Sequence, residues 1–200
     1  MENKITEIVF ILDKSGSMAG LEADTVGGYN SFLEKQKDIE GAVYISTMLF
    51  STESTVIHDR ADINTVRKMT LNDYLPCGGT ALYDAIGDAI KHIDTIHKYA
   101  RKEDVPQKTI FVITTDGMEN SSHRYSRRKI NAMITEHKAE KGWEFIFFGA
   151  NIDTETEGEA LGFDKSDCIS FKASPKGMKS FYNEVDSQFL QRVPMRKKKD

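Results

Sequence analysis

Apolar residues recur along this chain with two spacings, one typical of buried strands and the other of helices that cover a sheet. Continuous apolar runs predict strands that are covered on both faces. The predicted strands span residues 5–12, 42–50, 55–59, 109–114, 143–149 and 168–171. Helical spacing predicts helices near 23–37, 62–69, 81–96, 126–138, 154–161 and 176–190. The clearest helix is 81–96, whose apolar stripe leaves Asp84 outside it and contains Leu82, Ala85, Ile86, Ala89, Ile90 and Ile93.

The connections between these segments predict the fold. Only residues 51–54 separate the second strand from the third, which is too short for a crossover, so these two strands should pair as an antiparallel hairpin. The other strands alternate with helices, which favours parallel pairing with right-handed crossovers. We therefore expect an α/β fold: a three-layer, doubly wound, Rossmann-like, mostly parallel six-stranded sheet with one antiparallel edge strand and helices on both faces. The last helix should face the sheet with Met178, Phe181, Val185 and Phe189.

Length and composition are those of one globular domain. The chain has 200 residues, of which 39% are hydrophobic and 29% charged, and it has neither repeats nor a linker. Its apolar runs are far shorter than the roughly 18 residues that a membrane span requires. The first residues do not have the pattern of a secretory signal. We therefore expect a single domain over residues 1–191, no membrane partner and a cytoplasmic location.

Charge is unevenly distributed along the chain. The formal net charge is −4, yet residues 192–200 hold five basic side chains and one acidic one. The acidic remainder should repel nucleic acid, so we expect no nucleic-acid partner, and the short basic tail should be solvated. Cys77 and Cys168 are the only cysteines, far apart in sequence, and are expected to be buried free thiols. The five histidines show no metal-ligand spacing and are expected at the surface.

Oxygen-bearing side chains follow two predicted strands and precede the clearest helix. Asp13, Ser15 and Ser17 follow the first strand, Thr80 precedes 81–96, and Asp116 follows 109–114. Such loops meet at the carboxyl edge of an α/β sheet, where we expect both aspartates to face solvent. Side chains two residues apart share a face. Oxygen-only ligands favour Mg²⁺ or Mn²⁺ before Ca²⁺ and exclude a zinc-type site.

Each element also has a purely structural interpretation. Asp13 and Ser15 could close a turn, and Thr80 could cap the helix that follows it. Other chemistries lack their motifs, since the chain has no glycine-rich phosphate cradle and no G-x-S-x-G elbow. A phosphatase-like D-x-D motif would need a carboxylate at position 15, which is serine.

The three elements together resemble the von Willebrand factor A (VWA) domain family and its metal-ion-dependent adhesion site. The family pattern is D-x-S-x-S after the first strand, a distant threonine, and an aspartate after the fourth strand. Here it is matched by Asp13-Lys14-Ser15-Gly16-Ser17, Thr80 and Asp116, and the likeness spans residues 5–171. The chain looks most like short, stand-alone bacterial members. The resemblance implies direct metal ligation by Ser15 and Ser17, ligation by Thr80 directly or through water, and contacts of Asp13 and Asp116 through water.

The resemblance also implies a function. It is that of a divalent-cation-dependent, non-catalytic protein-binding module, which holds Mg²⁺ or Mn²⁺ and grips an Asp or Glu of an unidentified protein partner at an open coordination position. We expect rim contacts with the partner from Lys14, Met18, Glu119 and Asn120. In some relatives the final helix slides as metal coordination changes. The alternatives are a Mg²⁺-dependent hydrolase, for which no base or nucleophile is evident, and a structural domain with an unoccupied site.

Overall fold

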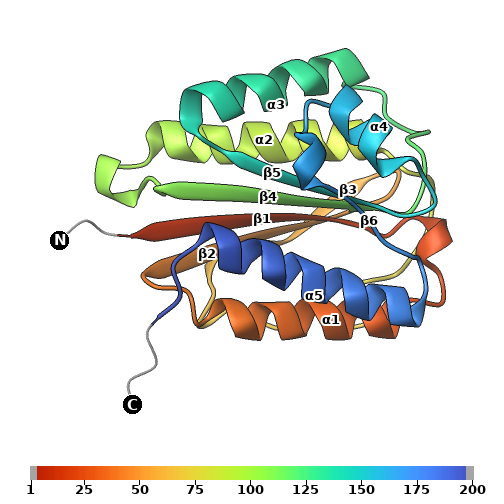
Figure 1. Ribbon diagram of the computed structural model, residues 1–200, viewed down its shortest axis with the longest axis horizontal. Helices are drawn as coiled ribbons and strands as arrows, with labels where there is room; N and C mark the ends of the chain where they lie inside the picture. The colour runs from red at the N-terminus through yellow and green to blue at the C-terminus, as the bar shows by residue number, and fades with distance from the viewer. Residues whose placement is uncertain (1–3, 197–200) are drawn as a thin grey trace.

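The computed structural model describes residues 4–196, which fold around one sheet (Figure 1). Within these residues the sheet has six strands in the order β3-β2-β1-β4-β5-β6. The strands are β1 (Ile5–Asp13), β2 (Ala42–Phe50), β3 (Ser54–Asp62), β4 (Lys108–Thr115), β5 (Glu144–Gly149) and β6 (Cys168–Ser170). The α-helices are α1 (Glu22–Gln36), α2 (Leu82–Tyr99), α3 (Arg127–Lys141), α4 (Thr154–Ala160) and α5 (Pro175–Arg192). Three 3-10 turns complete the list: η1 (Gly16–Met18), η2 (Lys102–Asp104) and η3 (Lys165–Asp167).

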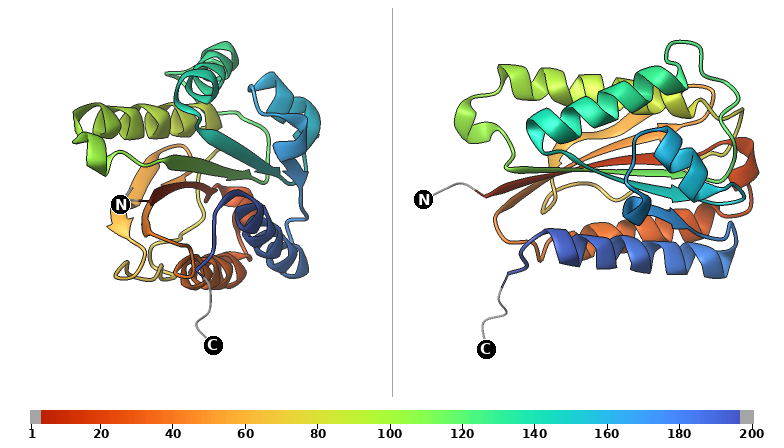
Figure 2. Two further views of the ribbon diagram at one scale, coloured as in Figure 1. Left: turned by 60° about the vertical axis from the view of Figure 1, so that its left-hand side comes forward. Right: turned by 45° about the horizontal axis from the view of Figure 1, so that its top comes forward.

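The arrangement of layers confirms the predicted α/β fold. Helices α1 and α5 cover one face of the sheet, and α2 and α3, with the shorter α4, cover the other (Figures 1 and 2). All neighbouring strands pair in parallel except β3, which runs antiparallel to β2 at one edge. None of the helices in residues 4–196 combines the length and the apolar character needed to cross a membrane.

Each face of the sheet has its own apolar core. Under α1 and α5, the Phe10 ring of β1 lies 5.5 Å from Tyr29 and 5.4 Å from Phe32, edge to face. The four α5 residues expected to face the sheet are all buried there: Met178, Phe181, Val185 and Phe189. Under α2 and α3, the predicted stripe of α2 packs on Ile11 and Phe111 of the sheet. The pattern of apolar residues therefore predicted which faces are buried.

The predicted helix at 62–69 is wrong, because Asp62 ends β3, residues 63–65 form a turn, and residues 66–69 are irregular. The Asp62 carboxylate accepts hydrogen bonds from the backbone N–H of Asn64 at 2.8 Å and from its side-chain amide at 2.9 Å. Further along, the Asp73 carboxylate accepts the backbone N–H and the hydroxyl of Thr70. Short polar side chains that bond nearby backbone groups compete with helix formation. The turns therefore replace the weak helical pattern.

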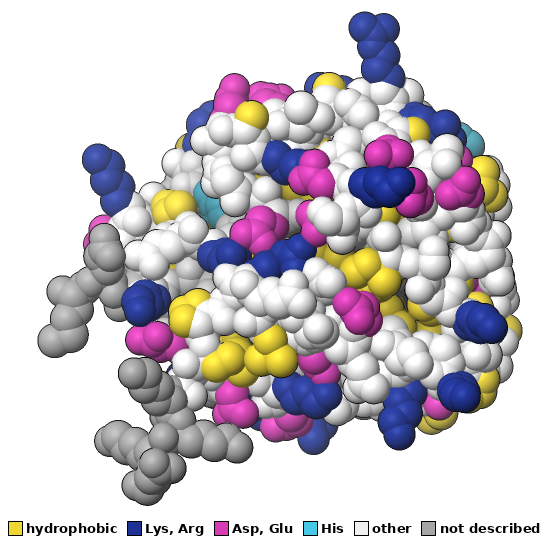
Figure 3. All heavy atoms as spheres, viewed as in Figure 1, with side chains coloured by type: hydrophobic (Ala, Val, Ile, Leu, Met, Phe, Trp, Pro, Cys, Tyr) yellow, Lys and Arg dark blue, Asp and Glu magenta, His cyan; other side chains and the backbone are white. Residues whose placement is uncertain are grey.

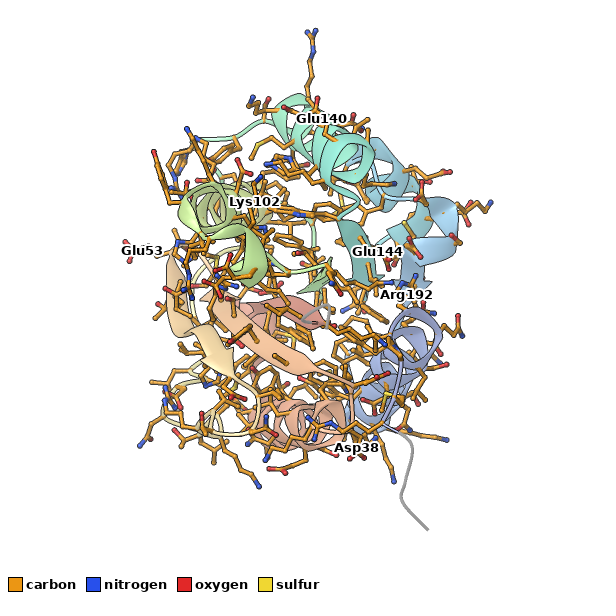
Figure 4. All side chains as sticks on the ribbon, turned by 90° about the vertical axis from the view of Figure 1, so that its left-hand side faces the viewer. Asp38, Glu53, Lys102, Glu140, Glu144 and Arg192 are labelled. Carbon is orange, nitrogen blue, oxygen red and sulfur yellow. The ribbon has the colours of Figure 1, made fainter. Side chains whose placement is uncertain are left out.

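The expected solvated tail differs from the structure over its first five residues. Arg192 ends α5 and lies beside Glu144 of β5, with its guanidinium 3.1 Å from that carboxylate (Figure 4). Val193 is buried, and Met195 forms an isolated bridge with Ile39. These contacts hold residues 192–196 against the body of the protein. Residues 197–200 of the predicted tail lie outside the described residues.

Two expectations, one about the cysteines and one about the histidines, are also wrong. Cys77 is exposed and Cys168 is only partly buried, although both were expected in the core. His58 and His137 are buried, although histidines were expected at the surface. His58 stacks on Tyr29, and His137 packs on Trp143 with its Nδ1 within 2.7 Å of the carbonyl of Met133. Tyr29 and Trp143 lie on other segments than the histidines they contact, and Met133 lies one helical turn before His137.

Helices α1 and α5 meet closely at a glycine. A Cβ added to Gly28 would lie 2.1 Å from the Tyr182 ring, whereas one added to the neighbouring Gly27 would meet nothing within 4 Å. Tyr182 also donates its hydroxyl to the carbonyl of Thr25 at 3.0 Å. The missing side chain at position 28 therefore lets Tyr182 of α5 dock on α1.

We predict opposite effects of alanine at these two glycines. Gly28→Ala should lower the free energy of unfolding by about 1–3 kcal/mol, because the new methyl group overpacks the Tyr182 contact. Gly27→Ala should raise it by up to about 1 kcal/mol, because alanine is the better helix former. Urea unfolding followed by circular dichroism measures both. Equal effects of the two substitutions would contradict the close α1–α5 contact.

Candidate metal centre

Three loops meet at the carboxyl end of the sheet. β1 and β4 are neighbouring parallel strands, so their ends bring the loop of residues 13–17 beside Asp116. The loop before α2 joins them through backbone hydrogen bonds, from Gly16 N–H to the carbonyl of Gly78 at 3.1 Å and from Cys77 N–H to that of Lys14 at 2.9 Å. It is also tied to the loop after β4, because the Thr80 carbonyl accepts the N–H of Asn120 at 3.0 Å.

The hydroxyls of the first loop face the carboxylate of the third. Ser17 Oγ donates to Asp116 Oδ1 at 2.6 Å, and Ser15 Oγ lies 3.4 Å from the same oxygen. The two serine oxygens are 3.1 Å apart. Ser15, Thr80 and Asp116 are buried, while Ser17 is exposed. The structure thus gathers two hydroxyls and one carboxylate and places the Thr80 loop against them.

Asp13 lies beneath this cluster and is completely buried, so the expectation that both aspartates face solvent is wrong. Its Oδ1 accepts the N–H of Ser15 at 2.7 Å, and its Oδ2 accepts the hydroxyl of Thr115 at 2.8 Å. Burial raises the pKa of Asp13 to about 6, although the hydrogen bonds from Ser15 and Thr115 act to lower it. Asp13 therefore links the loop after β1 to the end of β4.

The second carboxylate oxygen of Asp116 indicates what the cluster lacks. Asp116 Oδ2 is buried and has no hydrogen-bond partner among the described residues. A buried carboxylate oxygen without a donor is costly, so the site favours a cation. The side-chain atoms of the cluster that could bind a metal are all oxygens, which are the ligands of hard divalent cations. Nowhere in residues 4–196 do three His, Cys, Asp or Glu side chains gather to hold a metal ion, so such a site depends on its hydroxyls.

A buried acidic side chain of α2 shapes the loop after Asp116. Asp84, in the first turn of α2, is buried and accepts three backbone N–H groups, those of His123, Arg124 and Tyr125, at 2.9–3.0 Å. Burial opposes ionisation of Asp84, but these donors outweigh it and hold its pKa below the ordinary value. The sequence pattern placed Asp84 on the polar side of the helix and missed this role. The position of Asp84 in the first turn of a helix, where acidic side chains are favoured, is the sequence feature that could have indicated this role.

Glu119 and Asn120, expected at the partner-binding rim, are used within the protein. Glu119 Oε2 accepts the N–H of Tyr83 at 3.0 Å, and its Oε1 accepts those of Ser121 and Ser122. Asn120 is exposed, but its Oδ1 accepts the N–H of Thr80 at 2.9 Å. Both side chains join the third loop to the start of α2.

Met18 is not at the rim, because it is only 2% exposed and packs in the core under α1. The 3-10 turn η1 directs this apolar side chain inward. Lys14 remains partly exposed. Two apolar side chains of the site loops are instead open to solvent: Leu75 is 62% exposed and Met118 is 54% exposed. The exposed apolar side chains of the site loops are therefore Leu75 and Met118 rather than the predicted Met18.

We predict that Asp84, which accepts three N–H groups of the loop after Asp116, stabilises both the fold and the site. Asp84→Ala should lower the free energy of unfolding by about 2–4 kcal/mol, because three hydrogen bonds to a charged group are lost together. Asp88→Ala is the control, since the Asp88 carboxylate bonds only the exposed Arg124 guanidinium, and it should cost no more than about 1 kcal/mol. Denaturant unfolding measures both. A small effect of Asp84→Ala would show that the loop holds its shape without this cap.

Comparison with known proteins gives a consistent picture. The family model described as "von Willebrand factor type A domain" matches residues 7–184. A comparison with curated proteins finds no match to the chain.

Several solved structures share the fold. A structure of proximal thread matrix protein 1 from the mussel byssus, with a zinc-occupied MIDAS motif, has a TM-score of 0.64 and 14% identity over 92% of this chain. The chain spans only 45% of that mussel protein. The manganese-loaded TRAP protein of Plasmodium vivax has a TM-score of 0.64 and 15% identity, with coverage of 96% of this chain and 74% of that one. The vWF domain of the pilus tip protein Mfa5 of Porphyromonas gingivalis has a TM-score of 0.65 and 11% identity, with coverage of 93% and 96%.

Proposed function

Because this chain belongs to the von Willebrand factor type A domain family, we propose that it is a protein-binding module that depends on a divalent cation. In this proposal an intact metal-ion-dependent adhesion site, formed by Asp13, Ser15, Ser17, Thr80 and Asp116, holds Mg²⁺ or Mn²⁺. The ion then grips an acidic side chain of a protein partner. A stand-alone bacterial type, which rests on the motif resemblance, and a cytoplasmic location are also part of the proposal.

The observation that carries the proposal is the unpartnered oxygen of Asp116. It is buried beside the hydroxyls of Ser15 and Ser17, which are neutral ligands. A cation held by neutral hydroxyls keeps most of its positive charge, so a carboxylate from outside gains more there than at a site already filled with acids. The zinc in the mussel protein and the manganese in the Plasmodium protein support a divalent cation. Because one relative holds zinc, zinc is the competitor against which Mg²⁺ and Mn²⁺ are to be tested.

The exposed side chains of the site loops support a protein partner. Leu75 and Met118 present large exposed apolar side chains on two of the three loops, and apolar side chains form the buried core of protein–protein interfaces. A partner that places an acidic residue on the ion would cover these side chains at the same time. Binding without catalysis is part of the proposal, since no base or nucleophile is assigned at the site.

The first test is metal-dependent stability. In Mg²⁺ at a hundredfold excess over Kd, the native protein should gain about 2.7 kcal/mol relative to chelator, because only the folded state binds. Asp116→Asn should gain nothing, yet should be at least as stable as the native protein in chelator, because it replaces a carboxylate that has one buried oxygen without a donor. Thermal melts in Mg²⁺, Zn²⁺ and chelator measure this. Asp59→Asn, an exposed position on β3, is the control and should respond like the native protein. A Mg²⁺-dependent rise that persists in Asp116→Asn would place the ion elsewhere.

The second test asks whether the bound ion takes a carboxylate. Mn²⁺ titrations followed by electron paramagnetic resonance should show tighter Mn²⁺ binding in millimolar N-acetyl-aspartate methylamide, because coupling between two ligands is reciprocal. The matched neutral compound, N-acetyl-asparagine methylamide, should have no effect. The same samples should not hydrolyse p-nitrophenyl phosphate. Equal effects of the two amides, or hydrolysis that disappears in Asp116→Asn, would contradict a non-catalytic carboxylate-binding site.

A further inference from the structure

A second surface feature lies two strands away from the metal centre, between β6 and the first half of α5. It is a groove of about 430 Å³, which is within the size of binding pockets. Apolar atoms are visible in a hollow on this face of the molecule (Figure 3). The apolar side chains that line the groove are Phe148 of β5, Ile169 of β6, Phe171 just after β6, and Phe181 of α5.

One wall of the groove is an open edge of the sheet. β6 is the last strand of the sheet and pairs only with β5. The N–H of Phe171 donates to the carbonyl of Gly149 at 2.9 Å, toward β5. Successive backbone amides of an extended strand point to opposite edges, so the N–H of Ser170 points away from the sheet. No strand of residues 4–196 pairs with this outer edge. An open edge beside an apolar groove is the geometry with which domains add an extended peptide as a further strand.

Charge at the rim indicates the chemistry of the occupant. Lys172 and Lys176 line the groove, are exposed, and have no ion pair within the described part of the chain. The one acidic residue in the lining, Glu184, is bonded to the side chain of Gln188 at 2.9 Å. The rim is therefore positive in a protein whose net charge is −4, which favours an acidic peptide over a basic one.

From these observations we propose that the groove binds an extended, acidic segment of a protein partner, which adds to the sheet as a strand beside β6. Apolar side chains at every second position of the segment pack on the partly exposed Ile169 and Phe171, and its acidic end lies at Lys172 and Lys176. Backbone hydrogen bonds with Ser170 fix its register. This contact is independent of the metal centre and does not rest on the cation-dependent function proposed above.

A proline on the open edge tests strand addition directly. Proline is tolerated on an edge strand where its N–H would face solvent, so Ser170→Pro should fold while losing the donor that the peptide needs. Ser170→Ala, which keeps the N–H, is the matched control. The probe is the fluorescein-labelled peptide Thr-Val-Thr-Val-Thr-Ile-Asp-Glu with a free carboxyl end, followed by fluorescence anisotropy in chelator. We expect saturable binding to the native protein, a Kd within twofold for Ser170→Ala, and at least tenfold weaker binding for Ser170→Pro. Circular dichroism melts verify folding of each variant.

Charge reversal tests the acidic end of the peptide. The double variant Lys172→Glu/Lys176→Glu should bind the acidic probe at least tenfold more weakly and should bind a Lys-Lys-ended version more tightly than the native protein does. Asp116→Asn should bind the acidic probe as the native protein does.

Four results would overturn the proposal. The first is that the peptide does not bind the native protein saturably, and the second is that it binds Ser170→Pro and Ser170→Ala equally well. The third is that peptide binding requires Mg²⁺ and is lost in Asp116→Asn. The fourth is that dodecanoate binds and the peptide does not. The last would make the groove a site for small amphipathic anions.

Discussion

The buried carboxylate of Asp13 is the interaction on which the arrangement of the site depends. One of its oxygens fixes the first amide of the serine loop, and the other fixes the hydroxyl at the end of β4. The backbone carbonyl of Asp13 accepts the hydroxyl of Tyr74 at 2.5 Å, so the long segment before α2 is held at the same point. A single residue at the end of the central strand therefore organises all three loops. The pKa of Asp13 is raised because burial disfavours the ionised form of its carboxyl group.

The acidic side chains at this end of the molecule divide into two kinds. Asp84 and Glu119 have their oxygens filled by backbone donors of the third loop and of α2, so they act as internal caps. Asp116 instead keeps one buried oxygen without a donor. All three side chains are carboxylates at the same loop. They differ only in whether backbone N–H groups are close enough to donate to them. The incomplete carboxylate is the one where a cation gains most.

Helix α5 is capped at its start and fixed to the sheet at its end. At its start, Ser174 accepts the N–H of Gly177 at 3.1 Å as an N-cap. At its end, the carbonyl of Arg192 accepts a hydrogen bond from Lys108 at 2.6 Å, while its guanidinium pairs with Glu144. Between the two ends, Tyr182 occupies the space left by Gly28. With the helix held in this way, the side of its first half that faces β6 remains as an open groove, separate from the metal centre.

The sequence by itself determined the fold class, the buried faces of the helices and the residues that meet at the carboxyl end of β1 and β4. These follow from periodicity and from polar residues at strand ends, which are local signals that burial of apolar surface makes reliable. Only the tertiary structure decided that Met18 is buried, that Asp84, Glu119 and Asn120 are caps, and that Cys77 is exposed. Such outcomes depend on which donor or apolar surface another segment brings into contact. Asp84, for example, bonds to amides about forty residues further along the chain. No local pattern specifies those contacts, because they exist only once the sheet has placed its loops side by side.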